Sequence, residues 1–145
     1  MFKITCIAIL SFSFLLIQPL KASSLPLSSA FGKALQKGKE TQHMNSVRNF
    51  LINIGAIAGR DKKKNYTKAA ANKALSQISQ LSPSDVYFLN TDRKWSKVNN
   101  SKTPLICTRP TLLRGVIIVG WGDGHITTLK GNFKNLKAIK AKLKK

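Results

Sequence analysis

Residues 115–129, with the sequence GVIIVGWGDGHITTL, determine the architecture expected for this chain. Residues 115–121 are apolar and rich in valine and isoleucine, side chains that favour a β-strand. Residues 125–129 form a second β-prone run. The Asp-Gly pair between the runs is a strong hairpin signal, because a tight turn needs backbone angles that these residues tolerate. We therefore predict an antiparallel hairpin whose turn is made by Gly122, Asp123, Gly124 and His125.

Two shorter β-prone runs precede this hairpin, at residues 86–89 and 105–108. The segment between them, residues 90–103, is polar and rich in turn-forming side chains. It predicts a surface loop in which Trp95 is a candidate exposed contact. Together with the hairpin, these runs predict a small antiparallel sheet.

A basic helix is expected after the sheet, over residues 133–143, with Asn132 as its N-cap. Its apolar positions follow helical spacing. Residues 130–145 contain seven lysines and no acidic residue. Such a helix can cover the sheet or lie on an anionic membrane. We favour covering, because the apolar strands need a second layer. The apolar positions are Phe133, Leu136, Ile139 and Leu143, and the solvent-facing lysines are Lys134, Lys137, Lys140, Lys144 and Lys145.

Residues 27–58 predict one long helix or two helices in succession, with apolar side chains at steps of three and four. Residues 36–43 are wholly polar or glycine, which a packed core would not tolerate. We therefore expect the first half to be exposed and the second half to dock on the body. Residues 66–81 predict a second helix with one apolar stripe. The expected fold class is α+β: two helices, a small antiparallel sheet and a basic C-terminal helix.

Residues 1–24 have the order of a secretory signal: an early lysine, an apolar run over residues 4–17, and small residues at Ala22, Ser23 and Ser24. The run is shorter than the roughly 20 residues that a spanning helix needs. Cleavage after Ala22 or Ser24 and retention as an N-terminal anchor are both open. We expect the remainder, residues 25–145, to be a single exported domain in the periplasm, the cell envelope or the extracellular medium.

The charge balance is strongly basic: 25 Lys and Arg against 5 Asp and Glu, a formal net charge of +20. Such a surface attracts anionic glycan, lipid or nucleic acid. It is also compatible with a solvated surface that has no dedicated partner. The candidate polyanion contacts are Lys62, Lys63, Lys64, Trp95, Lys134, Lys137, Lys140, Lys144 and Lys145.

Catalytic chemistry has little support in the sequence. The five acidic residues are scattered, with no pair spaced for acid–base work. Asp123 and His125 are too few for a metal site and are expected to be structural, and His43 is expected to be solvated. If Cys6 leaves with the signal, Cys107 cannot form an intramolecular disulfide, and its apolar neighbours predict a buried thiol. We therefore expect no enzyme activity, no catalytic residue, no metal and no cofactor.

Two blocks of the sequence resemble the pseudopilin-like proteins of type II secretion and type IV pilus systems, especially those with a C-terminal Asp-Gly-His hairpin. The first block is residues 25–39 followed by residues 44–50 (MNSVRNF), where that family has a Leu-Pro-Ala-Leu-like start, charged residues and an apolar helical face. The second is residues 116–126 (VIIVGWGDGHI), preceded by a strand-like TPLIC at residues 103–107. Both blocks agree with the family in order and spacing.

The chain departs from the family at its beginning. A prepilin has a glycine just before its apolar helix and a glutamate within it, whereas here Lys3 precedes the apolar run and residues 4–17 contain no acid. The resemblance thus implies a pseudopilin-like body without the features used for prepilin processing and filament assembly.

The function that the resemblance implies is a non-enzymatic exported envelope protein, structural or accessory to type II secretion or pilus-like systems. Its partners would be other pilin-like subunits or envelope components, with membrane contact only if the N-terminal segment is retained. The alternative is a secreted cationic protein that binds anionic glycan, lipid or nucleic acid.

Overall fold

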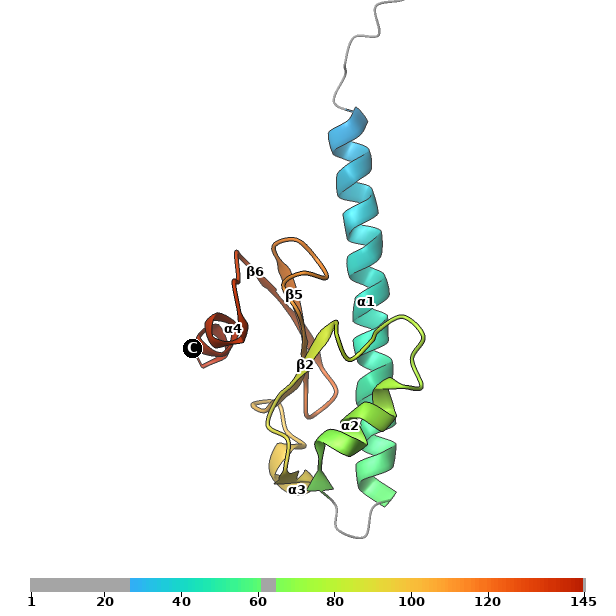
Figure 1. Cartoon of the computed structure of the whole chain (residues 1–145), viewed down its shortest axis with the longest axis vertical. Coiled ribbons are helices and arrows are strands. Elements are labelled where there is room, and N and C mark those ends of the chain that lie inside the picture. The colour runs from blue at the N-terminus through green and yellow to red at the C-terminus, as the bar shows by residue number, and fades with distance from the viewer. Residues whose placement is uncertain (1–26, 61–64, 145) are drawn as a thin grey trace, which may run out of the picture.

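The computed structural model describes residues 27–60 and 65–144 and has the expected α+β class (Figure 1). A long helix, α1 (Leu27–Arg60, 34 residues), runs beside a small antiparallel sheet. The prediction of one long N-terminal helix is confirmed, and it continues two residues beyond the expected end at Ala58.

The main sheet has four strands in the order β2-β4-β5-β6. Every neighbouring pair is antiparallel. The hairpin predicted from residues 115–129 is confirmed, with Val116 opposite Lys130 and Gly120 opposite Ile126. The strands are β2 (Val86–Phe88), β4 (Pro104–Thr108), β5 (Val116–Trp121) and β6 (Ile126–Lys130).

The second half of α1 packs on one face of this sheet. Its apolar side chains recur at helical spacing and belong to the larger core cluster; Val47, Phe50, Leu51, Ile54 and Ala58 are all buried. The approach to β5 is close at Gly120, where an added Cβ would lie 2.9 Å from side-chain carbons of Ile106 and Val47. Glycine is therefore needed there to let the helix and the strand come together.

The opposite face of the sheet is covered by α4 (Leu136–Leu143), as expected. Ile139 is fully buried against Cys107, Ile117 and Val119, while Leu136 and Leu143 pack at the edges of this second core. The predicted helix start was wrong. The side chain of Asn135, not Asn132, accepts a hydrogen bond from the Ala138 amide, and Phe133 packs on the core before the helix begins.

The second predicted helix is much shorter than residues 66–81. It is α2 (Lys68–Leu75), and Thr67 caps it by accepting a hydrogen bond from the Ala70 amide. Tyr66 belongs instead to a short strand, β1 (Asn65–Tyr66), because its ring is wholly buried and its hydroxyl donates to the Leu105 carbonyl at 2.7 Å.

Residues 90–103 are more ordered than a surface loop. They contain β3 (Arg93–Lys94), which pairs with β1, and a short helix, α3 (Trp95–Val98). Val98 is fully buried, and this apolar anchor ties the segment to the core. The prediction of a surface loop was therefore wrong for the middle of the segment.

Candidate functional site

The two parts of α1 differ sharply in exposure. Residues 29–39, here called the exposed segment, present solvent-accessible side chains, including Phe31 at 72% and Leu35 at 53% exposure. Residues 46–58, the docked segment, contain the buried residues described above. Figure 1 shows the beginning of α1 extending beyond the sheet. Phe31 and Leu35 are one turn apart and therefore lie on the same side of the helix.

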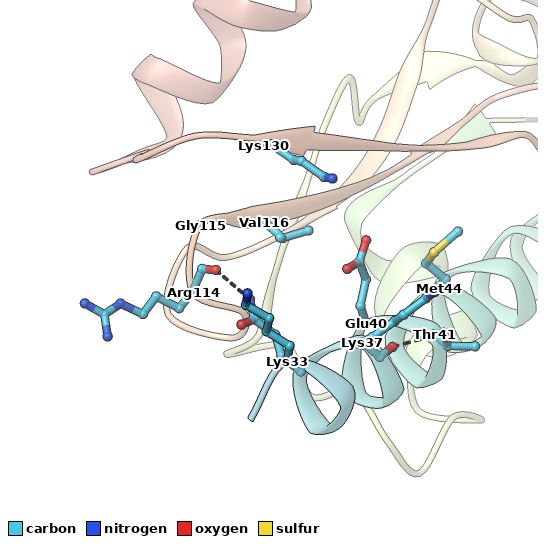
Figure 2. Close-up of a pocket in the computed structure, with 10 residues that line it drawn as sticks. Lys33, Lys37, Glu40, Thr41, Met44, Arg114, Gly115, Val116 and Lys130 are labelled. Carbon is cyan, nitrogen blue, oxygen red and sulfur yellow. Dashed lines mark hydrogen bonds between the residues drawn. The ribbon is translucent and has the colours of Figure 1, made fainter. Parts of the chain in front are cut away.

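A groove of about 680 Å³ lies where the exposed segment passes the open end of the β5–β6 hairpin (Figure 2). Gln36 Nε2 donates a hydrogen bond to the Arg114 carbonyl at 3.1 Å, which ties the helix to the loop before β5. The lining residues are Lys33, Gln36, Lys37, Glu40, Thr41, Met44, Arg114, Gly115, Val116 and Lys130. This feature is here called the α1 groove.

The α1 groove has mixed charge. Its walls carry four cationic residues and one carboxylate, that of Glu40. Figure 2 shows Glu40 and Lys130 pointing toward each other from α1 and β6. They are not within ion-pair distance, since the salt bridge found among residues 27–60 and 65–144 joins Asp123 and His125.

A second cavity of about 530 Å³, here called the α4 pocket, lies between the C-terminal helix and the ends of β2 and β4. Three lysines line it and no acidic residue does. Asn90 has a left-handed backbone (φ 54°), and its side-chain amide donates to the Pro104 carbonyl at 2.9 Å. The complete lining is Leu89, Asn90, Lys102, Pro104, Lys140, Leu143 and Lys144.

The Asp-Gly-His turn satisfies its own polar groups. Asp123 Oδ1 lies 2.5 Å from His125 Nδ1 and accepts a hydrogen bond from the His125 amide at 3.2 Å. Desolvation opposes the effect, but these two hydrogen bonds hold the pKa of the Asp123 carboxyl below its usual value. The His125 ring stacks on the Trp121 ring, with the two centroids 5.2 Å apart. The contacts of Asp123, His125 and Trp121 therefore stabilise the hairpin turn.

Glycine is required at both ends of this turn. Gly124 has a φ of +92°, a conformation that L side chains rarely adopt. At Gly122 an added Cβ would lie 1.7 Å from the Val98 carbonyl oxygen, and the Gly122 amide donates to the Thr103 carbonyl at 2.9 Å. The turn is thus locked against the segment that follows α3.

Cys107 is a core thiol, as predicted. It is completely buried in the second core, and burial raises its pKa to about 12. A thiol that stays protonated is a poor nucleophile. Burial likewise raises the pKa of Tyr66, whose hydroxyl is held by the Leu105 carbonyl.

His43 is not solvated as expected, but partly buried. Its Nδ1 is buried and has no hydrogen-bond partner among the described residues. Burial lowers the pKa of His43, with Asp85 opposing and Lys39 reinforcing that change. The prediction was wrong because the chain around residues 82–85 folds back near this turn of α1, which the local polar sequence does not reveal.

The described residues include five of the nine sequence-predicted polyanion contacts, and Lys137, Lys140 and Lys144 line one shallow cavity on α4. Lys62, Lys63, Lys64 and Lys145 lie outside the described residues. Trp95 is half-buried, with its ring 6.5 Å from that of Tyr66 and its indole 3.9 Å from a Cβ built at Gly55. Of the α4 group, Lys134, Lys137, Lys140 and Lys144 are exposed, and only the last two line the α4 pocket.

Neither the α1 groove nor the α4 pocket is evident from the sequence. The α1 groove brings Lys33 and Lys37 to Arg114 and Lys130, and the α4 pocket brings Lys102 to Lys140. These residues are far apart along the chain. Only the pairing of the strands and the packing of the helices on them could have revealed their proximity.

Over residues 27–60 and 65–144, no three His, Cys, Asp or Glu side chains gather in a way that could hold a metal ion. None of the helices in these ranges is both long and apolar enough to cross a membrane.

Comparison with known proteins gave no relative: no protein family, no curated protein and no solved structure matches the chain.

Proposed function

We propose that this chain is a non-enzymatic exported envelope protein of pseudopilin-like type, structural or accessory to type II secretion or pilus-like systems. It would act by packing the exposed segment of α1 against a partner helix. The partners would be other pilin-like subunits or envelope components.

The observation that carries this proposal is the unequal burial of one continuous helix. The docked segment is held by the larger core cluster, whereas the exposed segment presents Phe31 and Leu35 to solvent. A helical segment of this length is marginal in water without tertiary contacts. A partner that covered Phe31 and Leu35 would stabilise it by removing apolar surface from water.

The body of the molecule supports the same proposal. A long helix packed by its second half on an antiparallel sheet is the layout expected from the two family-like sequence blocks. The described part of the first block runs along α1 from the exposed segment into the docked segment, and the second block spans β5, the turn and β6. The proposed signal or anchor, residues 1–24, lies outside the described residues.

Site-specific photo-crosslinking in the producing cells tests the proposal. A benzophenone amino acid at position 31 or 35 should give a crosslink to a pilin-like or other envelope protein. The same amino acid at position 52 is the matched control, because Ile52 is 63% exposed on the docked segment of the same helix. Equal crosslinking from all three positions, or none from positions 31 and 35, would contradict the proposal.

Mass spectrometry of the native N-terminus complements this experiment. A free end after Ala22 or Ser24 would identify a cleaved signal, whereas an intact Met1 would identify a retained anchor. A cut directly after Lys3 would show prepilin-type processing despite the missing glycine.

The second candidate function is the binding of polyanions, and the exposed lysines on and next to α4 favour it. Retention on immobilised heparin should fall when Lys134, Lys137, Lys140 and Lys144 are all replaced by Gln. Replacement is preferable to deleting the helix, because Ile139 completes the second core. Unchanged retention of the quadruple variant would rule out α4 as the binding surface.

A further inference from the structure

The α1 groove and the α4 pocket differ in whether a carboxylate offsets their positive charge. In the α1 groove Glu40 faces Lys130 and can neutralise part of the cationic wall without any ligand. The α4 pocket has no acidic lining residue among the described residues, so its positive charge is uncompensated. Like charges held around one cavity repel each other, and a bound anion removes that repulsion.

The three lysines of the α4 pocket come from two separate parts of the chain. Lys140 lies on α4 and Lys144 is the C-cap residue one turn later, while Lys102 reaches the same cavity from the segment before β4. Lys140 directly follows Ile139, whose side chain is fully buried in the second core beneath α4.

The rest of the lining is apolar or anchored. Leu89, Pro104 and Leu143 supply a hydrophobic wall, and the hydrogen bond from Asn90 to the Pro104 carbonyl fixes the rim between β2 and β4. The volume of about 530 Å³ is within the range of small-molecule sites and exceeds what a bare phosphate ion needs. The pocket thus has room for an anionic group and a short organic part.

We propose that the α4 pocket binds a phosphate monoester, with Lys102, Lys140 and Lys144 around the phosphate and the hydrophobic wall against the ester group. Lysine ammonium groups bind phosphate as point charges, each with three donors. No arginine lines the pocket, so recognition depends on charge and on the shape of the ester rather than on a bidentate fork.

Nucleic acid is a poorer occupant. Proteins that bind single strands combine a charged groove with aromatic side chains on which bases stack, and none of the aromatic residues in the described part of the chain lines this pocket. The remaining sources of a phosphate monoester are a soluble metabolite and the head group of an anionic lipid. Both present the same charged group, so the experiment must separate them.

This inference deepens the second candidate function and is independent of the helix-packing proposal. The full chain, labelled with ¹⁵N, would be titrated with glycerol 3-phosphate while amide shifts are followed. A parallel arm would measure sedimentation with phosphatidylcholine vesicles that do or do not contain phosphatidic acid. The pocket variant is Lys102→Gln with Lys140→Gln, and the matched control is Lys134→Gln with Lys142→Gln, which removes the same charge outside the pocket.

We expect saturable amide shifts confined to residues 89–90, 102–103 and 140–144, with the affinity weakened at least tenfold in the pocket variant and less than twofold in the control. Saturation by glycerol 3-phosphate identifies a soluble ester. Binding only to vesicles that contain phosphatidic acid, again lost only in the pocket variant, identifies a lipid head group. Equal weakening in both variants, shifts spread over all lysines, or no binding in either arm would overturn the proposal. Heparin retention that survived such a failure would leave general polyanion binding standing without this pocket.

Discussion

The two segments of α1 belong to one helix, yet only one of them is part of a core. The docked segment carries an unbroken apolar stripe, and Phe50 is fully buried against the sheet. The exposed segment has the same backbone conformation, but Phe31 is 72% exposed. The difference shows that a segment of this chain can be helical without being buried. Substitutions of phenylalanine in both segments can test the difference in burial, because the helix carries Phe50 in the core and Phe31 in solvent.

The largest expected effect is that of Phe50→Ala compared with Phe31→Ala. Removing Phe50 leaves a cavity between α1 and β2, where its ring stacks on Phe88 with centroids 5.9 Å apart. The free energy of unfolding should fall by about 3–5 kcal/mol. Phe31→Ala should change it by less than about 0.5 kcal/mol, as for other exposed positions. Urea denaturation of both variants measures the contrast, and equal losses would mean that the exposed segment is packed in solution.

Raising the pH above 9 should lower the free energy of unfolding. Burial raises the pKa of Cys107 from 9.0 to about 12 and also raises that of Tyr66, so the folded state keeps protons that the unfolded chain loses. The stabilisation from the Cys107 thiol is complete below pH 9 and is lost as the pH rises toward 12, at about 1.4 kcal/mol per pH unit, whereas the stabilisation from Tyr66 is lost only above pH 10.

Chemical denaturation at a series of pH values measures this loss. Cys107→Ala removes one of the two ionising groups, so its stability should fall less steeply above pH 9 than that of the parent chain. Identical slopes for the two proteins would show that the thiol does not titrate as its burial requires.

Glycine-to-alanine substitutions in contact with the docked segment and on the exposed segment should change stability in opposite directions. At Gly120 the new Cβ would press on Val47 of the docked segment and on Ile106, and should destabilise the fold by about 1–3 kcal/mol. At Gly38, on the exposed segment, nothing lies within 4 Å of a new Cβ, and alanine should stabilise the helix by about 0.5–1 kcal/mol. Thermal melts of both variants measure the two effects. A loss of stability in Gly38→Ala would contradict the prediction and would mean that the exposed segment is packed against another part of the protein at this position.

The smallest effect concerns the cap of α4. Asn135→Ala removes the side-chain oxygen that accepts from the Ala138 amide and should reduce stability by about 1 kcal/mol. Asn132→Ala, three residues earlier, should be near neutral because Asn132 is exposed and does not cap the helix. If Asn132→Ala proved the more harmful of the two in urea melts, the helix start described here would be wrong.

Much of the fold could be predicted from local patterns. The Asp-Gly pair between two β-prone runs predicted the hairpin in the observed place, and the apolar spacing after Met44 predicted which half of α1 docks. Tyr66 was misplaced because alanine-rich residues after it extended the helical pattern, whereas its hydroxyl and ring are held in the core by Leu105 and Trp95. Tertiary packing overrode propensity there.

The candidate sites were less accessible to sequence reasoning. The pattern singled out the lysines of α4 correctly as a solvent-facing group, but it could not pair two of them with Lys102. Trp95 was judged exposed from its basic neighbours, although its ring is half-buried beside Tyr66. A run of charged residues in the sequence gives only the local composition. A cavity is formed by segments that are distant in the chain, so the run does not predict it.

Local sequence is enough to specify the periodicity of each element: the alternation and turn chemistry of residues 115–129, the apolar stripe of the docked segment and the amphipathic C-terminal helix. Those features depend on neighbouring residues, and short-range sterics and hydrogen bonding are enough to specify them. Long-range packing sets where α2 begins and ends, anchors residues 93–98 through Val98, and brings Lys102, Lys140 and Lys144 to one pocket. These outcomes rest on contacts between residues far apart in the chain, which arise only when both faces of the sheet are covered.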